Sequence, residues 1–367
     1  LSKNPDERWP SCTDFYQAVV EGSTQQPVPI DRRRYLKWIA GAAGVALAAG
    51  VWWWKSRAKW KVVRDFEWPA VMKTDNHFRT LVTDAYGDWL LGNADYSIEH
   101  PELTKGYPVM WDLKTGRIRK VLDVQGGPAI AFAPYTMEFR WFATGSDDGE
   151  LLLWNTKSTE KEPTTFAGHL PPTSISSVAF NDNGKQLLTS ATDNSVRLWN
   201  RLTGQEVKRF DGHTNYVLNA LFALSDQMIV SSSFDGTVRL WDANTGDCTK
   251  KLVGNTGQVW SLIVTPSNRA ISGSNDGWVI EWDLVEGKEL RRWNVGYWVQ
   301  RLALSVNKRW LFISGDTHGQ LIDLPTGQLL WEDESPLFDI GICWHPKEPD
   351  QLFASGPGKV QLIRVRG

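Results

Sequence analysis

The sequence is poor in residues that bind metals or form disulfides. Its 367 residues include three cysteines, Cys12, Cys248 and Cys343, and six scattered histidines. An odd number of widely separated cysteines cannot build a disulfide framework, and no histidine spacing is typical of a zinc site. We therefore expect neither a metal centre nor a disulfide-stapled domain.

The sequence also lacks an excess of charge of either sign. Its 40 basic and 42 acidic residues leave a formal net charge of −2. Nucleic-acid binding usually requires a concentrated basic face. We therefore expect no nucleic-acid partner.

Motifs for phosphoryl transfer are missing as well. The chain contains no Gly-rich phosphate loop, no HRD-type catalytic loop and no DFG-type metal motif. These are the parts with which kinases hold ATP and Mg²⁺. We therefore expect no catalytic residue and no cofactor within residues 1–367.

Tryptophan, by contrast, is abundant and recurs with a period. Among the 21 tryptophans, five occupy the last position but one of similar segments, such as DNSVRLWN and DGTVRLWD. Seven aligned positions follow one another at steps of 43, 45, 42, 41, 40 and 41 residues: Trp111, Trp154, Trp199, Trp241, Trp282, Ile322 and Ile363. Alternating apolar segments such as SVAF and tight Asp-Gly turns within each unit predict β-strands joined by hairpins. This period predicts a propeller with four strands per blade.

One further strand precedes the first complete unit. It is WKVVRDF, residues 60–66, whereas the last unit ends after its third strand. Pairing the two would close the ring and remove two exposed strand edges. We therefore predict an all-β, seven-bladed propeller over residues 60–367, closed by strand 60–66.

The units resemble WD40 repeats. A Gly-His pair followed by Ser or Thr, Asp and Trp is typical of that family and occurs twice, as His169, Thr189, Asp193 and Trp199 and as His213, Ser231, Asp235 and Trp241. The next unit keeps Ser272, Asp276 and Trp282 but has Asn255 in place of the histidine. The resemblance implies that these sets form hydrogen bonds across a blade, a structural role rather than half of a catalytic triad.

The resemblance also implies a binding rim, because in WD40-like propellers the residues that open the innermost strands meet at one face. These positions hold Arg79, Tyr216, Leu218, Gln258, Trp260, Trp298, Gln300 and Phe338, and a long loop from Asp95 to Gly106 is expected over the same face. Aromatic side chains and arginine dominate interface hot spots. We predict a protein or peptide ligand held by Trp260 and Trp298. The alternative is that some of these aromatic side chains point into the blades as core.

An uncharged run, residues 38–54, lies before the propeller. Extended to residues 35–54, with the ammonium group of Lys37 reaching toward the lipid headgroups, it is long enough for a transmembrane helix. Tryptophans at both ends suit the two membrane interfaces. Small residues such as Ala40 and Gly44 would permit a helix–helix homodimer. A buried soluble helix is the alternative.

The first segment, LSKNPDER, is followed by a short helical pattern and resembles the end of a Hanks-type Ser/Thr protein kinase domain. The resemblance implies that Arg8 is the family's arginine that pairs with a glutamate of the activation segment, and that ATP and Mg²⁺ belong to a kinase domain upstream. The expected organisation is a kinase remnant at 1–21, a linker at 22–34, a transmembrane helix at 35–54, a juxtamembrane segment at 55–59 and the propeller at 60–367.

This layout is similar to that of bacterial receptor-like kinases. We therefore expect a sensor propeller in the bacterial inner membrane, with the kinase side cytoplasmic and the propeller extracytoplasmic. One alternative is a membrane-tethered WD40 scaffold without an active kinase. The other is a quinone-dependent propeller dehydrogenase. Those enzymes resemble an eight-bladed plan with tryptophan at the end of the fourth strand, whereas the repeated tryptophan of this chain is expected on the third strand.

Overall fold

The computed structural model describes residues 60–69, 78–94, 107–122, 124, 127–134, 141–156, 162–166, 168–315, 318–334, 341–356 and 358–365. The chain divides into two units, Leu1–Ala58 and Lys59–Gly367, and all described residues belong to the second. The predicted kinase end with Arg8, the linker, the transmembrane helix and the juxtamembrane segment therefore lie outside the described residues. Within the described part of the chain, no helix is long and apolar enough to cross a membrane.

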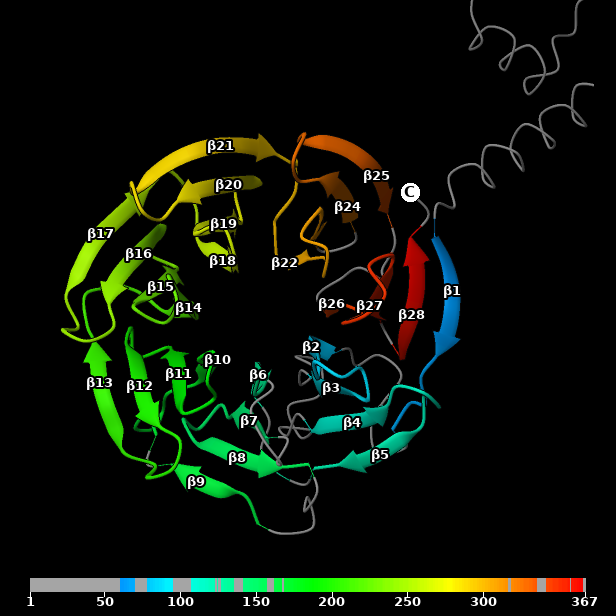
Figure 1. Ribbon diagram of the computed structural model, residues 1–367, viewed down its shortest axis with the longest axis horizontal. Coiled ribbons are helices and arrows are strands. Elements are labelled where there is room, and N and C mark those ends of the chain that lie inside the picture. The colour runs from blue at the N-terminus through cyan, green and yellow to red at the C-terminus, as the bar shows by residue number, and fades with distance from the viewer. Residues whose placement is uncertain are drawn as a thin grey trace, which may run out of the picture. The chain divides into compact units, whose positions relative to one another are not determined.

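The second unit is a ring of seven four-stranded antiparallel sheets, the blades of the predicted propeller (Figure 1). Blade 1 contains β2 (Phe78–Thr83), β3 (Trp89–Ala94), β4 (Pro108–Asp112) and β5 (Ile118–Val121). Blade 2 contains β6 (Ala129–Phe132), β7 (Trp141–Gly145), β8 (Leu151–Asn155) and β9 (Thr164–Phe166). Blade 3 contains β10 (Ile175–Phe180), β11 (Gln186–Ala191), β12 (Val196–Asn200) and β13 (Glu206–Phe210).

The chain continues around the ring in the same way. Blade 4 contains β14 (Val217–Ala223), β15 (Met228–Ser233), β16 (Thr237–Asp242) and β17 (Cys248–Val253). Blade 5 contains β18 (Val259–Thr265), β19 (Arg269–Ser274), β20 (Trp278–Asp283) and β21 (Lys288–Asn294). Blade 6 contains β22 (Arg301–Leu304), β23 (Trp310–Ser314), β24 (His318–Asp323) and β25 (Gln328–Glu334).

Blade 7 combines the two ends of the propeller. Its strand order is β26 (Ile342–Trp344), β27 (Gln351–Gly356), β28 (Lys359–Val365) and then β1 (Trp60–Asp65), the segment expected at 60–66. β1 runs antiparallel to β28, with Trp60 opposite Val365 and Asp65 opposite Gln361. Figure 1 shows the two strands side by side, blue against red. The outer edge of β28 is therefore paired, and the ring is closed through the first strand of the propeller.

The seven positions aligned in the sequence are all buried on the third strands. The tryptophans Trp111, Trp154, Trp199, Trp241 and Trp282 are between 0% and 5% exposed, and Ile322 and Ile363 take the same place at 3% and 0%. These side chains belong to apolar clusters, several of which join one blade to the next; one of them contains Leu198 of blade 3 and Ile229 of blade 4. Burial of apolar area between neighbouring blades is thus the main force that holds the ring together.

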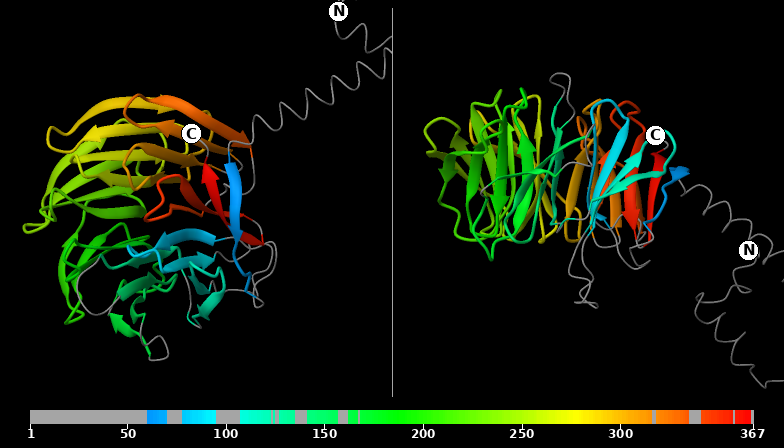
Figure 2. Two further views of the ribbon diagram at one scale, coloured as in Figure 1. Left: turned by 45° about the vertical axis from the view of Figure 1, so that its right-hand side comes forward. Right: turned by 90° about the horizontal axis from the view of Figure 1, so that it is seen from below.

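The outermost strands are less buried than the inner strands, because one of their faces meets water. β21 alternates exposed and half-buried residues along its whole length, whereas β27 is buried throughout. Side views of the propeller show strands running from one face of the ring to the other, so that loops and strand ends gather at two rims (Figure 2). A rim thus collects residues from many blades that are far apart in the sequence.

Candidate binding site at the propeller rim

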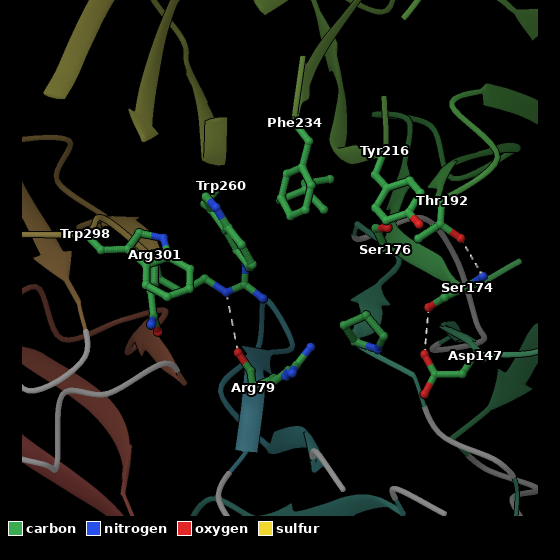
Figure 3. Close-up of a pocket in the computed structure, with 13 residues that line it drawn as sticks. Arg79, Asp147, Ser174, Ser176, Thr192, Tyr216, Phe234, Trp260, Trp298 and Arg301 are labelled. Carbon is green, nitrogen blue, oxygen red and sulfur yellow. Dashed lines mark hydrogen bonds between the residues drawn. The ribbon is translucent and has the colours of Figure 1, made fainter. Parts of the chain in front are cut away.

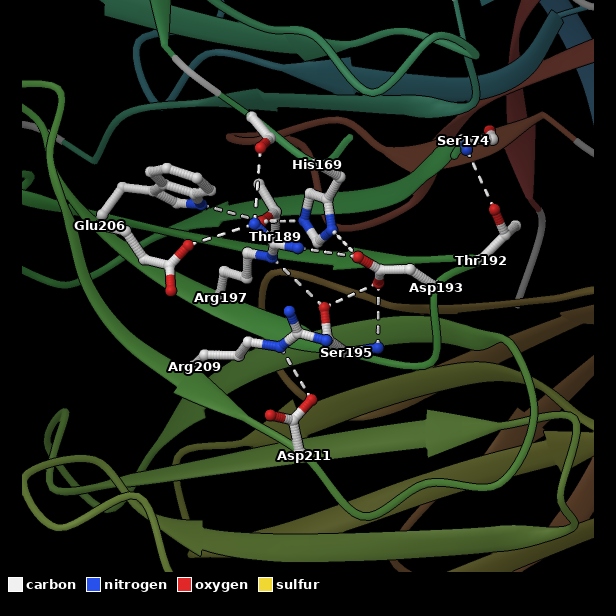
Figure 4. A network of polar contacts seen from close by, with 12 residues as sticks. His169, Ser174, Thr189, Thr192, Asp193, Ser195, Arg197, Glu206, Arg209 and Asp211 are labelled. Atoms are coloured by element: carbon white, nitrogen blue, oxygen red, sulfur yellow. Dashed lines mark hydrogen bonds and ion pairs between the residues drawn. The ribbon is translucent and has the colours of Figure 1, made fainter. Parts of the chain in front are cut away.

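The first predicted hydrogen-bond set forms one continuous relay in blade 3 (Figure 4). The Trp199 Nε1–H donates to Thr189 Oγ1 at 2.9 Å, and Thr189 Oγ1 is 2.9 Å from His169 Nε2. His169 Nδ1 is 2.9 Å from Asp193 Oδ2. Because an ionised carboxylate can only accept, Nδ1 carries the proton, and in a neutral ring Nε2 accepts from the threonine hydroxyl. A neutral histidine therefore satisfies every group in the relay.

Blade 4 repeats this relay with Trp241, Ser231, His213 and Asp235. The three successive distances are 2.8, 2.7 and 2.8 Å. Burial lowers the pKa of His213 despite the neighbouring carboxylate, in agreement with a neutral ring. Burial alone would raise the pKa of Asp235, but hydrogen bonds from His213 and Thr237 outweigh it and hold that pKa well below its usual value.

The charges beside the relay of blade 3 are paired within the blade. Arg197 contacts the Asp193 carboxylate at 3.0 Å and that of Glu206 at 3.2 Å. The Asp193 pKa is held well below its usual value because hydrogen bonds, chiefly from His169 and Ser195, outweigh the effect of burial. The relay histidines are buried and bonded on both ring nitrogens, an arrangement that supports blade structure rather than proton transfer to a substrate.

Blade 5 has an incomplete relay. The Trp282 Nε1–H still donates to Ser272 Oγ at 2.8 Å, but Asn255 Nδ2 reaches that oxygen only at 3.4 Å. The Asp276 carboxylate instead accepts from the backbone N–H groups of Thr256 and Gly257, both at 2.9 Å. The buried Asn255 Oδ1 has no hydrogen-bond partner among the described residues. Replacing histidine by asparagine therefore breaks the link between serine and aspartate.

The first two blades hold their tryptophans without a histidine. In blade 2 the Trp154 Nε1–H donates to Thr144 Oγ1 at 3.0 Å. In blade 1 the Trp111 Nε1–H donates to the Glu67 carbonyl at 2.8 Å, and Gly92 takes the place of the serine or threonine. A Cβ at Gly92 would lie within 3.0 Å of Phe78 and Trp111, so this packing requires glycine.

A pocket of about 280 Å³ lies at one rim, where inner strands begin and second strands end (Figure 3). Its lining comes from blades 1 to 6: Arg79, Pro128, Asp147, Ser174, Ser176, Thr192, Tyr216, Leu218, Phe234, Trp260, Trp298, Gln300 and Arg301. The structure therefore brings Arg79, Tyr216, Trp260, Trp298 and Gln300 of the predicted rim set together around one cavity.

Four aromatic rings form a continuous arc in this pocket. Tyr216 lies 5.8 Å from Phe234, which lies 4.8 Å from Trp260, and Trp260 lies 4.7 Å from Trp298, measured between ring centroids. Tyr216 is 45% exposed and the two tryptophans are half-buried, unlike the fully buried tryptophans of the third strands. The arc thus presents aromatic surface to the cavity.

Among the described residues of the predicted rim set, Gln258 alone does not line the pocket. Its Oε1 accepts a hydrogen bond from Trp260 Nε1 at 3.2 Å, and its backbone N–H donates to Asn275 Oδ1 at 2.8 Å. Gln258 therefore orients Trp260. Phe338 and the loop 95–106 lie outside the described residues.

Several lining residues were not predicted. Asp147, Thr192 and Phe234 each lie one or two residues after a second strand, at the position just before the turn aspartate. The shared place before Asp-Gly or Asp-Asn is a sequence signal that could have identified them. Arg301, the first residue of β22, follows Gln300 and could not be assigned to the pocket by periodicity, because its neighbour in sequence already occupies the rim position.

Comparison with known proteins supports the repeat assignment. The model of the family "WD domain, G-beta repeat" matches residues 160–200, 204–242 and 246–283, which include both complete relays and the incomplete one. Three repeats of the chain therefore match the WD40 model, and they lie within a seven-bladed propeller.

Similar proteins come from Aspergillus niger, Arabidopsis thaliana and Danio rerio. The chain is 27% identical over 132 residues to the nuclear distribution protein nudF of Aspergillus niger, covering 31% of this chain and 29% of that protein. It is 25% identical over 130 residues to a guanine nucleotide-binding protein subunit beta of Arabidopsis thaliana, covering 33% of this chain and 34% of that protein. WD repeat-containing protein 91 of Danio rerio is 31% identical over 101 residues, 28% of this chain and 14% of that protein. The matches thus span about a third or less of these relatives.

Proposed function

We propose that the propeller binds a peptide or protein segment in the rim pocket, with Trp260 and Trp298 as its main contacts. The observation that carries this proposal is the aromatic arc, in which four rings from blades 4, 5 and 6 face one cavity. Rigid aromatic side chains bury a large area at a small cost in conformational entropy, which is why they dominate binding hot spots.

A selection experiment tests this proposal. A peptide display library is panned against the full chain in detergent micelles, and an enriched peptide is resynthesised with a photoreactive side chain. We expect crosslinks to the pocket, at residues such as Tyr216, Phe234 and Trp298. Crosslinks confined to the outermost strands, for example to β13 or β21, would contradict the proposed site. Failure to enrich any peptide would contradict the proposed function.

We also propose that the propeller is the membrane-anchored interaction part of a bacterial receptor-like Ser/Thr protein kinase. The support comes from the phrase LSKNPDER with Arg8 and from the uncharged run of residues 38–54 that follows it. The parent gene decides between this proposal and a membrane-tethered scaffold without an active kinase. Catalytic HRD-type and DFG-type motifs encoded in frame upstream of Leu1 would agree with the kinase, and an upstream sequence without them would favour the scaffold.

A further inference from the structure

Arg301 occupies an unusual position in the lining of the rim pocket. It begins β22 in blade 6, yet its guanidinium reaches blade 1 (Figure 3), although blade 7 lies between these two blades in the ring (Figure 1). There its Nε is 3.4 Å from the Arg79 carbonyl oxygen and its Nη2 is 3.5 Å from Thr80 Oγ1. Both distances lie at the outer limit for hydrogen bonds, and neither acceptor carries a charge.

Two other arginines of the propeller with limited exposure have carboxylate partners, whereas the half-buried Arg201 donates to the Gly184 carbonyl oxygen. Arg197 pairs with Asp193 and Glu206, and Arg291 pairs with Glu281. Within the described residues, Arg301 forms no ion pair with any carboxylate. Burial and the neighbouring positive charge of Arg79 lower the pKa of Arg301 to about 10. A cation in this place is costly unless something neutralises it, and a ligand can supply the missing charge.

The two walls of the pocket differ in charge. Arg79 and Arg301 lie on one side, beside Trp260 and Trp298, whereas the Asp147 carboxylate, which accepts from Ser174 Oγ at 2.6 Å, lies on the other (Figure 3). A guanidinium presents a planar fork of donors that matches a carboxylate. Because Asp147 repels anions, a carboxylate with one negative charge suits this pocket better than a dianionic phosphate.

We propose that the rim pocket recognises an acidic side chain of a protein ligand, whose carboxylate pairs with Arg301 while a neighbouring apolar side chain packs on Trp260 and Trp298. This inference rests on the proposed peptide-binding function and deepens it by naming the ligand chemistry. The opposite wall then favours a donor in the ligand, a backbone N–H or a basic side chain, directed at Asp147.

A double-mutant cycle tests the pairing. We expect the peptides enriched on the full chain to share an Asp or Glu beside an apolar residue. Changing that acid to its amide should weaken binding to the wild-type propeller about tenfold or more, and Arg301→Met should weaken binding of the acidic peptide to the same degree. The Arg301→Met variant should bind the acidic peptide and its amide with nearly equal affinity. Arg301→Lys keeps the charge but loses the planar fork of donors. Its affinity for the acidic peptide should lie between those of the wild type and Arg301→Met. Arg209→Met is the matched control, since Arg209 lies in the outer strand β13 and pairs with Asp211.

Melting curves separate this role from a structural one. Removing a half-buried charge that has no carboxylate partner among the described residues should leave the melting temperature of Arg301→Met unchanged or raise it, whereas loss of a structural arginine would lower it. Enriched peptides without an acid, equal binding of peptide and amide, or tighter binding of a phosphoserine peptide than of the glutamate peptide would overturn the inference and leave the proposed function standing. If no peptide is enriched at all, both the function and the inference are contradicted.

Discussion

The histidine that opens a blade decides whether its hydrogen-bond relay is complete. With His213 in place, each donor from Trp241 to the ring meets an acceptor, and the chain of bonds ends on the ionised Asp235. With Asn255 in that place, the relay is broken and one buried amide oxygen has no partner among the described residues. A buried acceptor without a partner costs free energy, so the two blades should differ in local stability.

Reciprocal substitutions test this account. His213→Asn should lower the free energy of unfolding by about 1–3 kcal/mol, because Asp235 loses a buried donor. Asn255→His should raise it by about 1 kcal/mol, because it would reconnect Ser272 with Asp276. Both free energies can be measured by denaturant titration of the full chain. The account is wrong if His213→Asn is neutral and Asn255→His is destabilising.

Individual elements are held in place by residues that join blades, and the closing strand shows this best. Phe66 directly follows β1 and is 5% exposed. Its ring lies 6.4 Å from that of Trp111 in blade 1 and 5.7 Å from that of Phe353 in blade 7. Its backbone N–H donates to the Val360 carbonyl at 2.9 Å. Phe66 therefore fastens the closing strand to both blades at the joint of the ring.

Phe66→Ala should destabilise the propeller by about 3–5 kcal/mol, because it leaves a cavity between two blades. Val63→Ala is the matched control, since Val63 lies on the same strand and is 46% exposed. The control should change stability by no more than about 0.5 kcal/mol. Thermal or denaturant unfolding measures both variants, and equal stabilities would show that the closing strand contributes little.

The strands of the blades could be predicted from the sequence, because one requirement, burial of the third strand, recurs in every repeat. The aligned position of each third strand is buried, so it must be apolar, and the rule extends from Trp199 to Ile322 and Ile363. The details of individual blades were less accessible. The contact of Trp111 with a backbone carbonyl depends on the chain crossing from β1 into blade 1, which no local pattern contains. The aromatic arc was predicted only in part, because Phe234 joins it from the end of a second strand and the predicted rim set covered only the residues that open inner strands.

At the scale of the whole molecule, the ring brings together residues that are far apart in the sequence. Residues from Arg79 to Arg301 reach one pocket because every blade delivers its strand ends to the same rim. Arg301 could not be assigned to this pocket from the sequence, since only the closed ring places it against blade 1. A binding site of this kind depends on all blades being present, so destabilising the joint of the ring should also weaken binding.

The segment before the propeller carries the proposal of a membrane anchor. If residues 35–54 span the membrane, the full chain should stay in the membrane fraction through carbonate washing, because a spanning helix is inserted almost irreversibly. Replacing Val45 and Leu47 by Asp should release it, since charges at the centre of a span are costly. Recovery of the unaltered chain in the soluble fraction would contradict the proposal.

The central claim, that the rim aromatics form a binding site and not core, is tested most directly by measuring affinity and melting on the same preparations. Trp260→Ala and Trp298→Ala should each weaken binding of the selected peptide by about 2 kcal/mol or more. Their melting temperatures should remain close to that of Trp293→Ala, a half-buried tryptophan of the outer strand β21, whose peptide affinity should match the wild type. Unfolding of both rim variants, or unchanged affinity in both, would contradict the account.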